Sequence, residues 1–282
     1  MYDLHVHTTC SDGKYSKLEL LKKMNDRGFE CVSFTDHNYF SNDCNLLNTL
    51  YYNQYLKQQN VELINGVELD IKEYPRLHIL GYDIKNSDLL ENVLTAKALE
   101  NKEICKLIVK KIHQYYNIMI PFEKLEQIAF NTFVTKNIIV QWLIDNGFAK
   151  NVYEAGMLYT SKYSPCYEER SSLNLQEAID LIKKCGGIPI MAHPSSIKYD
   201  DKKLVKFVSY LKDLGIEGIE VFNADKTSEN ELLLFLKIAE KLGLLMTSGS
   251  DFHREEETKV LGVDNNYSNS FIKLVRERKH EL

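Results

Sequence analysis

Six of the eight histidines in this 282-residue chain occur in short motifs, shared with carboxylates, that stand at the ends of apolar runs. The motifs are Asp3-Leu4-His5-Val6-His7, Thr35-Asp36-His37, Gly66-Val67-Glu68, His78, Ala192-His193-Pro194 and Ser250-Asp251-Phe252-His253. Imidazole and carboxylate groups are common ligands of divalent metals. The set therefore predicts a site for several divalent metals and, through it, metal-dependent hydrolysis.

The spacing indicates how these side chains are positioned. Alternate residues of a strand face the same side, so His5 and His7 point together, as do Asp251 and His253. Apolar runs at 31–34, 61–64, 188–191 and 244–246 are typical of buried strands. In α/β barrels, groups from different strands converge at the C-terminal rim. We therefore expect the candidate ligands to cluster at one rim.

A single buried histidine is more often a satisfied core residue than a ligand. Six imidazoles and several carboxylates buried together without metal would each incur a desolvation cost, which favours the metal interpretation. The other two histidines, His113 and His280, lie in polar helical stretches and are expected at the surface. Cys10, close to His7, could be a soft ligand, but a small filler residue is the favoured interpretation.

Composition limits the class of protein. A hydrophobic content of 44% and a formal charge of -5 fit a globular protein and argue against extended nucleic-acid binding or an anionic-membrane binder. A strand is predicted from the first residues, and no apolar run approaches about 18 residues. Both features favour a cytoplasmic protein. Its six cysteines lack C-x-x-C spacing, as expected of reduced thiols.

Strands and helices alternate along most of the chain. Strands are predicted at 2–7, 31–35, 61–64, 67–71, 77–82, 188–192, 217–222 and 244–249, with those at 67–71 and 77–82 forming a short strand pair. Helices are predicted near 16–28, 42–59, 175–185, 201–214 and 228–242. Residues 86–163 instead show helical periodicity, with Pro121 opening one helix and Gly147 closing another. We expect an α/β domain of residues 1–85 and 164–282 with an all-helical insertion at 86–163.

The insertion is close to neutral: residues 86–165 hold 9 lysines and 8 acidic residues, a net charge of +1. This balance favours a cap over a small-substrate pocket and disfavours a long basic groove for nucleic acid.

Taken in order, these motifs resemble the PHP (polymerase and histidinol phosphatase) family, and among its members the stand-alone phosphoesterases that act on nucleotides. The resemblance is carried by Asp3 to Thr8, Ser11-Asp12-Gly13, Thr35-Asp36-His37, Gly66-Val67-Glu68, His78 to Gly81, Gly186-Gly187 with Ala192-His193-Pro194, and Gly249 to His253. It covers nearly the whole chain. It implies a distorted (β/α)7 barrel that binds up to three metals.

The resemblance also implies a ligand set. His5, His7, Glu68 and Asp251 would form a first metal site, Glu68 would bridge to a second with His78 and His193, and Asp12, His37 and His253 would form a third. Mixed ligands of this kind suit two to three ions of Mn²⁺, Fe²⁺ or Zn²⁺. Among these residues Glu68, Asp251 and His193 are the catalytic candidates. For Asp36 and Asp70 a role in orienting the ligands is favoured over direct metal binding.

The chain departs from the resemblance in the region expected to bind substrate. Nucleotide-hydrolysing relatives usually carry Arg-Pro-His in the insertion, where this chain has Lys136-Asn137-Ile138, so a cation remains without the bidentate guanidinium. Arg254 replaces a family glycine, and Arg170 precedes the helix that leads to His193. Lys136, Arg170 and Arg254 are the candidate substrate-binding residues, each weighed against a surface role.

The sequence thus predicts a metal-dependent phosphatase that removes a phosphomonoester from a small anionic substrate, with a nucleotide favoured. A nuclease trimming short oligonucleotides with the same metals is one alternative. A non-catalytic, metal-containing protein that binds a phosphorylated metabolite is another, disfavoured by the intact ligand set.

Overall fold

The computed structural model describes residues 1–40, 61–129, 133–224, 226–255 and 260–280. The chain divides into two compact units, one formed by Met1–Asn92 with Leu173–Leu282 and the other by Val93–Ser172. The helix predicted near 42–59 lies outside the described residues. The second unit begins and ends later along the chain than the insertion expected at 86–163.

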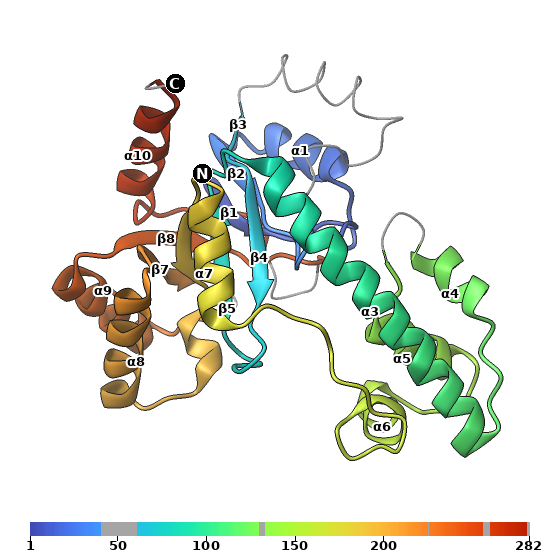
Figure 1. The fold of residues 1–282 in the computed structure, drawn as a ribbon. Helices are drawn as coiled ribbons and strands as arrows, with labels where there is room; N and C mark the ends of the chain where they lie inside the picture. Colours follow the sequence, from blue (N-terminus) through green and yellow to red (C-terminus); the bar gives the residue numbers. More distant parts are fainter. Residues whose placement is uncertain (41–60, 130–132, 225, 256–259, 281–282) are drawn as a thin grey trace. The chain divides into compact units, whose positions relative to one another are not determined.

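The first unit holds two hydrogen-bonded sheets (Figure 1). One has the order β1 (Tyr2–Val6), β2 (Cys31–Phe34), β3 (Glu62–Leu63), with parallel pairing throughout. The other has the order β4 (Gly66–Asp70), β5 (His78–Tyr82), β6 (Ile188–Met191), β7 (Gly218–Asn223), β8 (Leu245–Gly249). In it β5 is antiparallel to both neighbours, while β6, β7 and β8 are parallel. The predicted α/β class is confirmed.

Backbone hydrogen bonds also connect the two sheets at two points. Where β8 ends beside β1, the Asp251 N–H donates to the His5 carbonyl at 2.8 Å. Where β2 ends beside β4, the Glu68 N–H donates to the Asp36 carbonyl at 3.2 Å. Both junctions involve candidate ligands or their neighbours, so the residues that link the sheets are also those that build the site.

The strands form where the sequence is largely apolar, because both of their faces are covered. All residues of β1, β2 and β6 are buried. One core cluster joins Leu4 of β1, Leu80 of β5 and Ile190 of β6. Packing of this kind fixes the strand ends, and with them the backbone positions of the candidate ligands.

Helices flank the sheets: α1 (Lys17–Asp26), α7 (Leu175–Lys184), α8 (Asp201–Leu214), α9 (Glu229–Leu242) and α10 (Asn269–His280). Helix α7 contacts β5 and β6, and α9 contacts α8, β7 and β8 (Figure 1). Capping boxes start α1 at Ser16, α7 at Asn174 and α9 at Ser228, which explains why these starts could be predicted. A 3-10 turn, Pro194–Ile197, follows β6.

The second unit is helical. It contains most of α3 (Ser87–Tyr116), then α4 (Phe122–Ala129), α5 (Lys136–Asp145), α6 (Val152–Ala155) and a π-helix at Gly156–Thr160. As predicted, Pro121 precedes α4, and Gly147, with φ +77°, follows the end of α5. Within the described parts of the chain, no helix has the length and apolarity that a membrane span requires.

Candidate metal centre

The structure brings the predicted ligands into four overlapping groups. They are His5, His7, Glu68 and Asp251; Glu68, His78 and His193; His7, Asp12, His37 and His253; and His37, Asp70 and His78. Within each group, the nitrogen and oxygen atoms available for coordination lie within 4.8 Å of one another. The nine positions expected to bind metal therefore lie together in the first unit, and Asp70 joins them.

Glu68 is at the centre of this arrangement. It is completely buried on β4, and its Oε2 lies 3.3 Å from His5 Nε2 and 3.2 Å from His7 Nε2. Its Oε1 lies 2.8 Å from His78 Nδ1 and 2.9 Å from His193 Nε2. His37 Nδ1 also lies 3.3 Å from Oε2. One carboxylate thus presents its two oxygens to different sets of imidazoles, the geometry expected of a residue shared by two metal sites.

Asp251 completes the group on the Oε2 side. Its Oδ1 lies 3.1 Å from His7 Nε2 and 3.4 Å from His5 Nε2. The residue follows β8 and has a positive φ of +54°, an uncommon conformation for a residue with a Cβ. Backbone strain of this kind costs on the order of 1–3 kcal/mol and is found mainly at functional sites.

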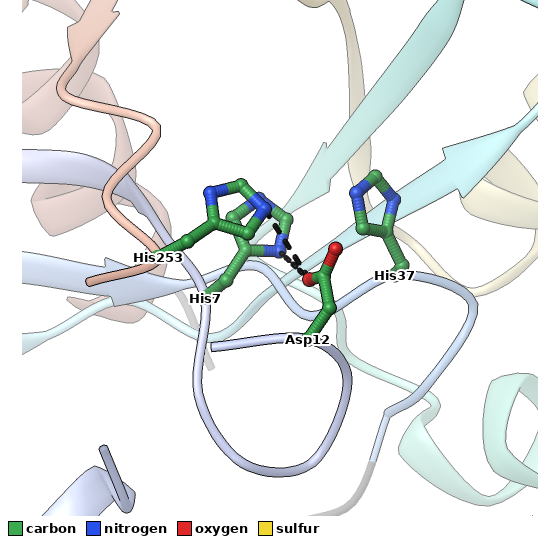
Figure 2. A group of neighbouring side chains, drawn as sticks. All are labelled: His7, Asp12, His37 and His253. Carbon is green, nitrogen blue, oxygen red and sulfur yellow. Dashed lines mark ion pairs between the residues drawn. The ribbon is translucent and has the colours of Figure 1, made fainter. Parts of the chain in front are cut away.

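Figure 2 shows the third predicted group, Asp12, His37 and His253, which His7 joins in the structure. Asp12 Oδ1 lies 3.3 Å from His253 Nε2 and 3.6 Å from His7 Nδ1, the two ion pairs drawn as dashed lines. The rings of His7 and His253 stack with centroids 4.1 Å apart. His7 therefore belongs to two groups, because its two ring nitrogens face different carboxylates.

Asp36 holds the loop that carries Asp12. Its carboxylate accepts hydrogen bonds from the Thr8 N–H at 2.8 Å, the Thr8 hydroxyl at 2.7 Å and the Ser11 hydroxyl at 2.7 Å. Asp36 is almost fully buried. The Asp36 carboxylate thus fixes the loop that surrounds the third group.

Asp70 lies directly beside two of the predicted ligands. Its Oδ1 is 3.0 Å from His37 Nδ1 and 3.6 Å from His78 Nε2, so it faces imidazoles of the second and third predicted sites. Asp70 is two residues from Glu68 on β4, and alternate strand residues share a face.

The charges of the cluster stabilise one another. Burial by itself lowers the pKa of His37, but the carboxylates of Glu68, Asp70 and Asp12 outweigh burial and raise this pKa to about 10. Burial raises the pKa of Glu68, but His37, His5 and other imidazoles outweigh it and hold this pKa well below its usual value. Protons thus supply the positive charge that the carboxylates require, and bound cations would displace them.

Buried atoms without hydrogen bonds give a second reason to expect metal ions at this site. The buried atoms His5 Nε2, His7 Nε2 and Glu68 Oε2 make no hydrogen bond within the described part of the chain, although they face one another. Buried polar atoms are normally satisfied, and such exceptions call for an explanation. A divalent cation between two nitrogens and a carboxylate oxygen would satisfy all three.

Two charged residues near the site were not anticipated from the sequence. Lys226, in the loop after β7, forms an ion pair with Asp251 Oδ2. Glu220 is completely buried within β7 and contacts His5. A glutamate inside the apolar run Ile219–Val221 was the available signal, since an acidic residue in a buried strand needs a partner.

Of the three candidate substrate-binding residues, one belongs to the first unit and two belong to the second. Arg254 is exposed and follows His253 in the first unit. Arg170 is exposed in the second unit. Lys136, also in the second unit, donates to the Glu168 carbonyl and lies 4.9 Å from the centre of the Tyr167 ring. Their role in binding substrate stays a prediction.

His113 is exposed on α3, and none of the metal-binding groups found among the described residues includes Cys10.

Comparison with known proteins identifies the family. The chain matches the PHP domain over residues 3–152, which is more than half its length, and it belongs to that family. It is 26% identical over 257 residues to a 5'-3' exoribonuclease of Haemophilus influenzae, covering 89% of each chain. It is 24% identical over 265 residues to a 3',5'-nucleoside bisphosphate phosphatase of Chromobacterium violaceum, covering 90% of this chain and 88% of the relative.

A solved structure shows the same fold. It is described as an amidohydrolase from Chromobacterium violaceum with bound sulfate and no metal. The match has a TM-score of 0.76 at 22% identity and covers 98% of this chain and 96% of that one.

Proposed function

We propose that this protein is a metal-dependent phosphoesterase that hydrolyses a phosphomonoester of a small anionic substrate, with a nucleotide as the favoured class. The observation that carries the proposal is the position of Glu68, whose two oxygens face the imidazoles of two groups. Family membership supports the same class of enzyme.

The nine predicted ligands would hold two to three divalent ions of Mn²⁺, Fe²⁺ or Zn²⁺. Such ions, when bound, supply hydroxide at neutral pH and neutralise phosphoryl oxygens. Glu68 and Asp251 would contribute the negative charge that holds these ions, and His193 contacts Glu68 on its Oε1 side. Lys226, paired with Asp251, places a further positive charge at the same rim.

We also propose that strands β1, β2 and β4–β8 form a distorted (β/α)7 barrel with residues 86–163 as a helical insertion. The two backbone junctions between the sheets, at Asp251–His5 and Glu68–Asp36, support this arrangement. The similarity in fold to a solved structure over nearly the full chain is consistent with it.

The names of the relatives support a nucleotide substrate. One is a phosphatase of 3',5'-nucleoside bisphosphates, and another is a 5'-3' exoribonuclease that covers 89% of this chain. The second name keeps a second candidate function open, the trimming of short oligonucleotides. Under either function Lys136, Arg170 and Arg254 are the proposed contacts to the anionic substrate, because all three carry a positive charge.

A phosphate-release screen tests the proposal. The protein, loaded in turn with Mn²⁺, Fe²⁺ or Zn²⁺, is offered nucleoside monophosphates, 3',5'-bisphosphates and short 5'-phosphorylated oligonucleotides. Phosphate release from mononucleotides supports the phosphatase, whereas stepwise shortening of oligonucleotides supports the nuclease. If the metal-loaded protein acts on none of the three substrate classes, both candidate functions are overturned.

A further inference from the structure

A carboxylate that belongs to none of the metal-binding groups lies directly behind them. Glu220, in the middle of β7, is completely buried between the equally buried Ile219 and Val221. Placing a charged carboxylate in such surroundings costs several kcal/mol unless specific partners compensate for the lost solvent. The contacts of Glu220 therefore indicate its role in the protein.

Both oxygens of Glu220 are engaged by residues that reach the metal-binding groups. Oε1 lies 3.0 Å from His5 Nδ1. Oε2 accepts a hydrogen bond from the backbone N–H of His193 at 2.7 Å and another from the Asn223 side chain at 3.3 Å. Glu220 thus connects a candidate ligand within β1, His5, with one that follows β6, His193.

The contact with His5 determines which ring nitrogen faces the centre. When Nδ1 carries the proton donated to Glu220, Nε2 is left to coordinate. His5 Nε2 is the atom that lies 3.3 Å from Glu68 Oε2 and 3.4 Å from Asp251 Oδ1.

The contact with His193 holds an unusual backbone conformation. His193 has φ +23° and ψ 69°, a region that residues with a Cβ rarely adopt. This conformation places its Nε2 2.9 Å from Glu68 Oε1. The hydrogen bond from its N–H to Glu220 is one of the interactions that secure it.

We propose that Glu220 is a positioning residue that binds no metal itself but aligns His5 and His193 on the two opposite oxygens of Glu68. It thereby sets the metal affinity of two groups at once. The inference rests on the metal centre in the proposed function, and it extends that function by making the affinities of the two groups depend on one buried side chain.

Glu220→Gln tests this role with almost no change in volume. The amide has one acceptor oxygen, so it can accept from His193 or from His5 but must turn its NH₂ toward the other. We expect Zn²⁺ affinity, measured by competition with a chromophoric chelator, to fall about 10- to 100-fold. Glu217→Gln is the matched control, because Glu217 precedes the same strand but is partly exposed and pairs with Lys183 outside the site.

A second measurement needs no variant. In the Zn²⁺-loaded wild type, ¹⁵N NMR of the histidine rings should show His5 with Nε2 bound to the metal and Nδ1 carrying a hydrogen-bonded proton. Metal on Nδ1, or wild-type Zn²⁺ affinity in Glu220→Gln, would overturn the role of Glu220 and leave the proposed function standing. A wild type that binds no divalent metal would overturn the proposed function as well. If Glu220→Gln does not fold, the NMR result decides.

Discussion

Replacing Glu68 by glutamine should separate a metal centre from an ordinary buried polar cluster. The substitution keeps the shape of the side chain and removes one negative charge from between five imidazoles, the nearest at 2.8 Å and the farthest at 3.3 Å. An amide oxygen remains for one side of the residue, but the NH₂ group on the other side cannot coordinate a cation.

The expected loss follows from these contacts. An interaction with a charged group is worth about 1.5–3 kcal/mol, and two predicted metal sites share this carboxylate. A loss near 2.7 kcal/mol in the transition state corresponds to about a hundredfold in rate. We therefore expect Glu68→Gln to reduce turnover at least about a hundredfold, and Asp251→Asn to act similarly because it removes the second anion beside His7.

The assay combines phosphate release with elemental analysis and circular dichroism of the same preparations. Both variants should keep the fold and lose activity, and Glu68→Gln should retain less metal. His113→Ala is the control, since its side chain is exposed on α3 and should leave turnover unchanged. Near-native turnover in both carboxylate variants with metal retained would refute the assignment.

Four further predictions concern metal content, pH dependence, thiol chemistry and substrate. The purified protein should bind two to three divalent ions per chain, and fewer than one ion per chain in elemental analysis would contradict this. Chelation should lower its melting temperature, because bound ions stabilise only the folded state. Burial raises the pKa of Glu62, but its ion pairs with two cations of α10 outweigh burial and lower this pKa. The stabilisation is therefore present above about pH 4.5 and is lost as the pH falls through the folded-state pKa. Glu62→Gln should cost up to about 1 kcal/mol at pH 7 in denaturant titrations, and the difference from the wild type should shrink as the pH is lowered below about 4.5; a difference that does not change with pH would contradict this. Burial raises the pKa of the Cys31 thiol to about 12, so native protein should resist alkylation there at pH 8, as read by mass spectrometry, and rapid labelling would show that the strand opens. Lys136→Arg combined with Ile138→His should raise kcat/KM for nucleotides about tenfold, if about 1.4 kcal/mol of transition-state binding returns; efficient cleavage by the wild type, near about 10⁴ M⁻¹s⁻¹, would remove the basis for this expectation.

Most helices and strands could be predicted because their signals are local. Helix α8 lies at the predicted residues, and the capping boxes of α7 and α9 mark their starts within the sequence itself. Helix α10 was not predicted. Its apolar residues Phe271, Ile272, Leu274 and Val275 form one short run between polar and charged stretches, too short to predict a helix by periodicity. Three of them, Phe271, Ile272 and Val275, are buried in the core cluster that also holds β1, β5 and β6.

Apart from the expected pair of 67–71 with 77–82, which is confirmed, strand pairing was beyond the sequence. The apolar runs predicted strands, but periodicity does not tell which runs pair or in which direction. The antiparallel insertion of β5 between β4 and β6 depends on contacts between residues more than a hundred positions apart, such as Leu80 with Ile190.

For the site, the sequence determined the types of ligand. It also determined which side chains share a face, as for His5 and His7, because side chains alternate along a strand. Tertiary structure alone decided the distances between strands. These distances place Asp70 beside His37 and His78, and they put Glu220 behind His5. The physical reason is that a side chain's facing direction is a property of its own strand, whereas its neighbours across the sheet are set by the packing of the whole core.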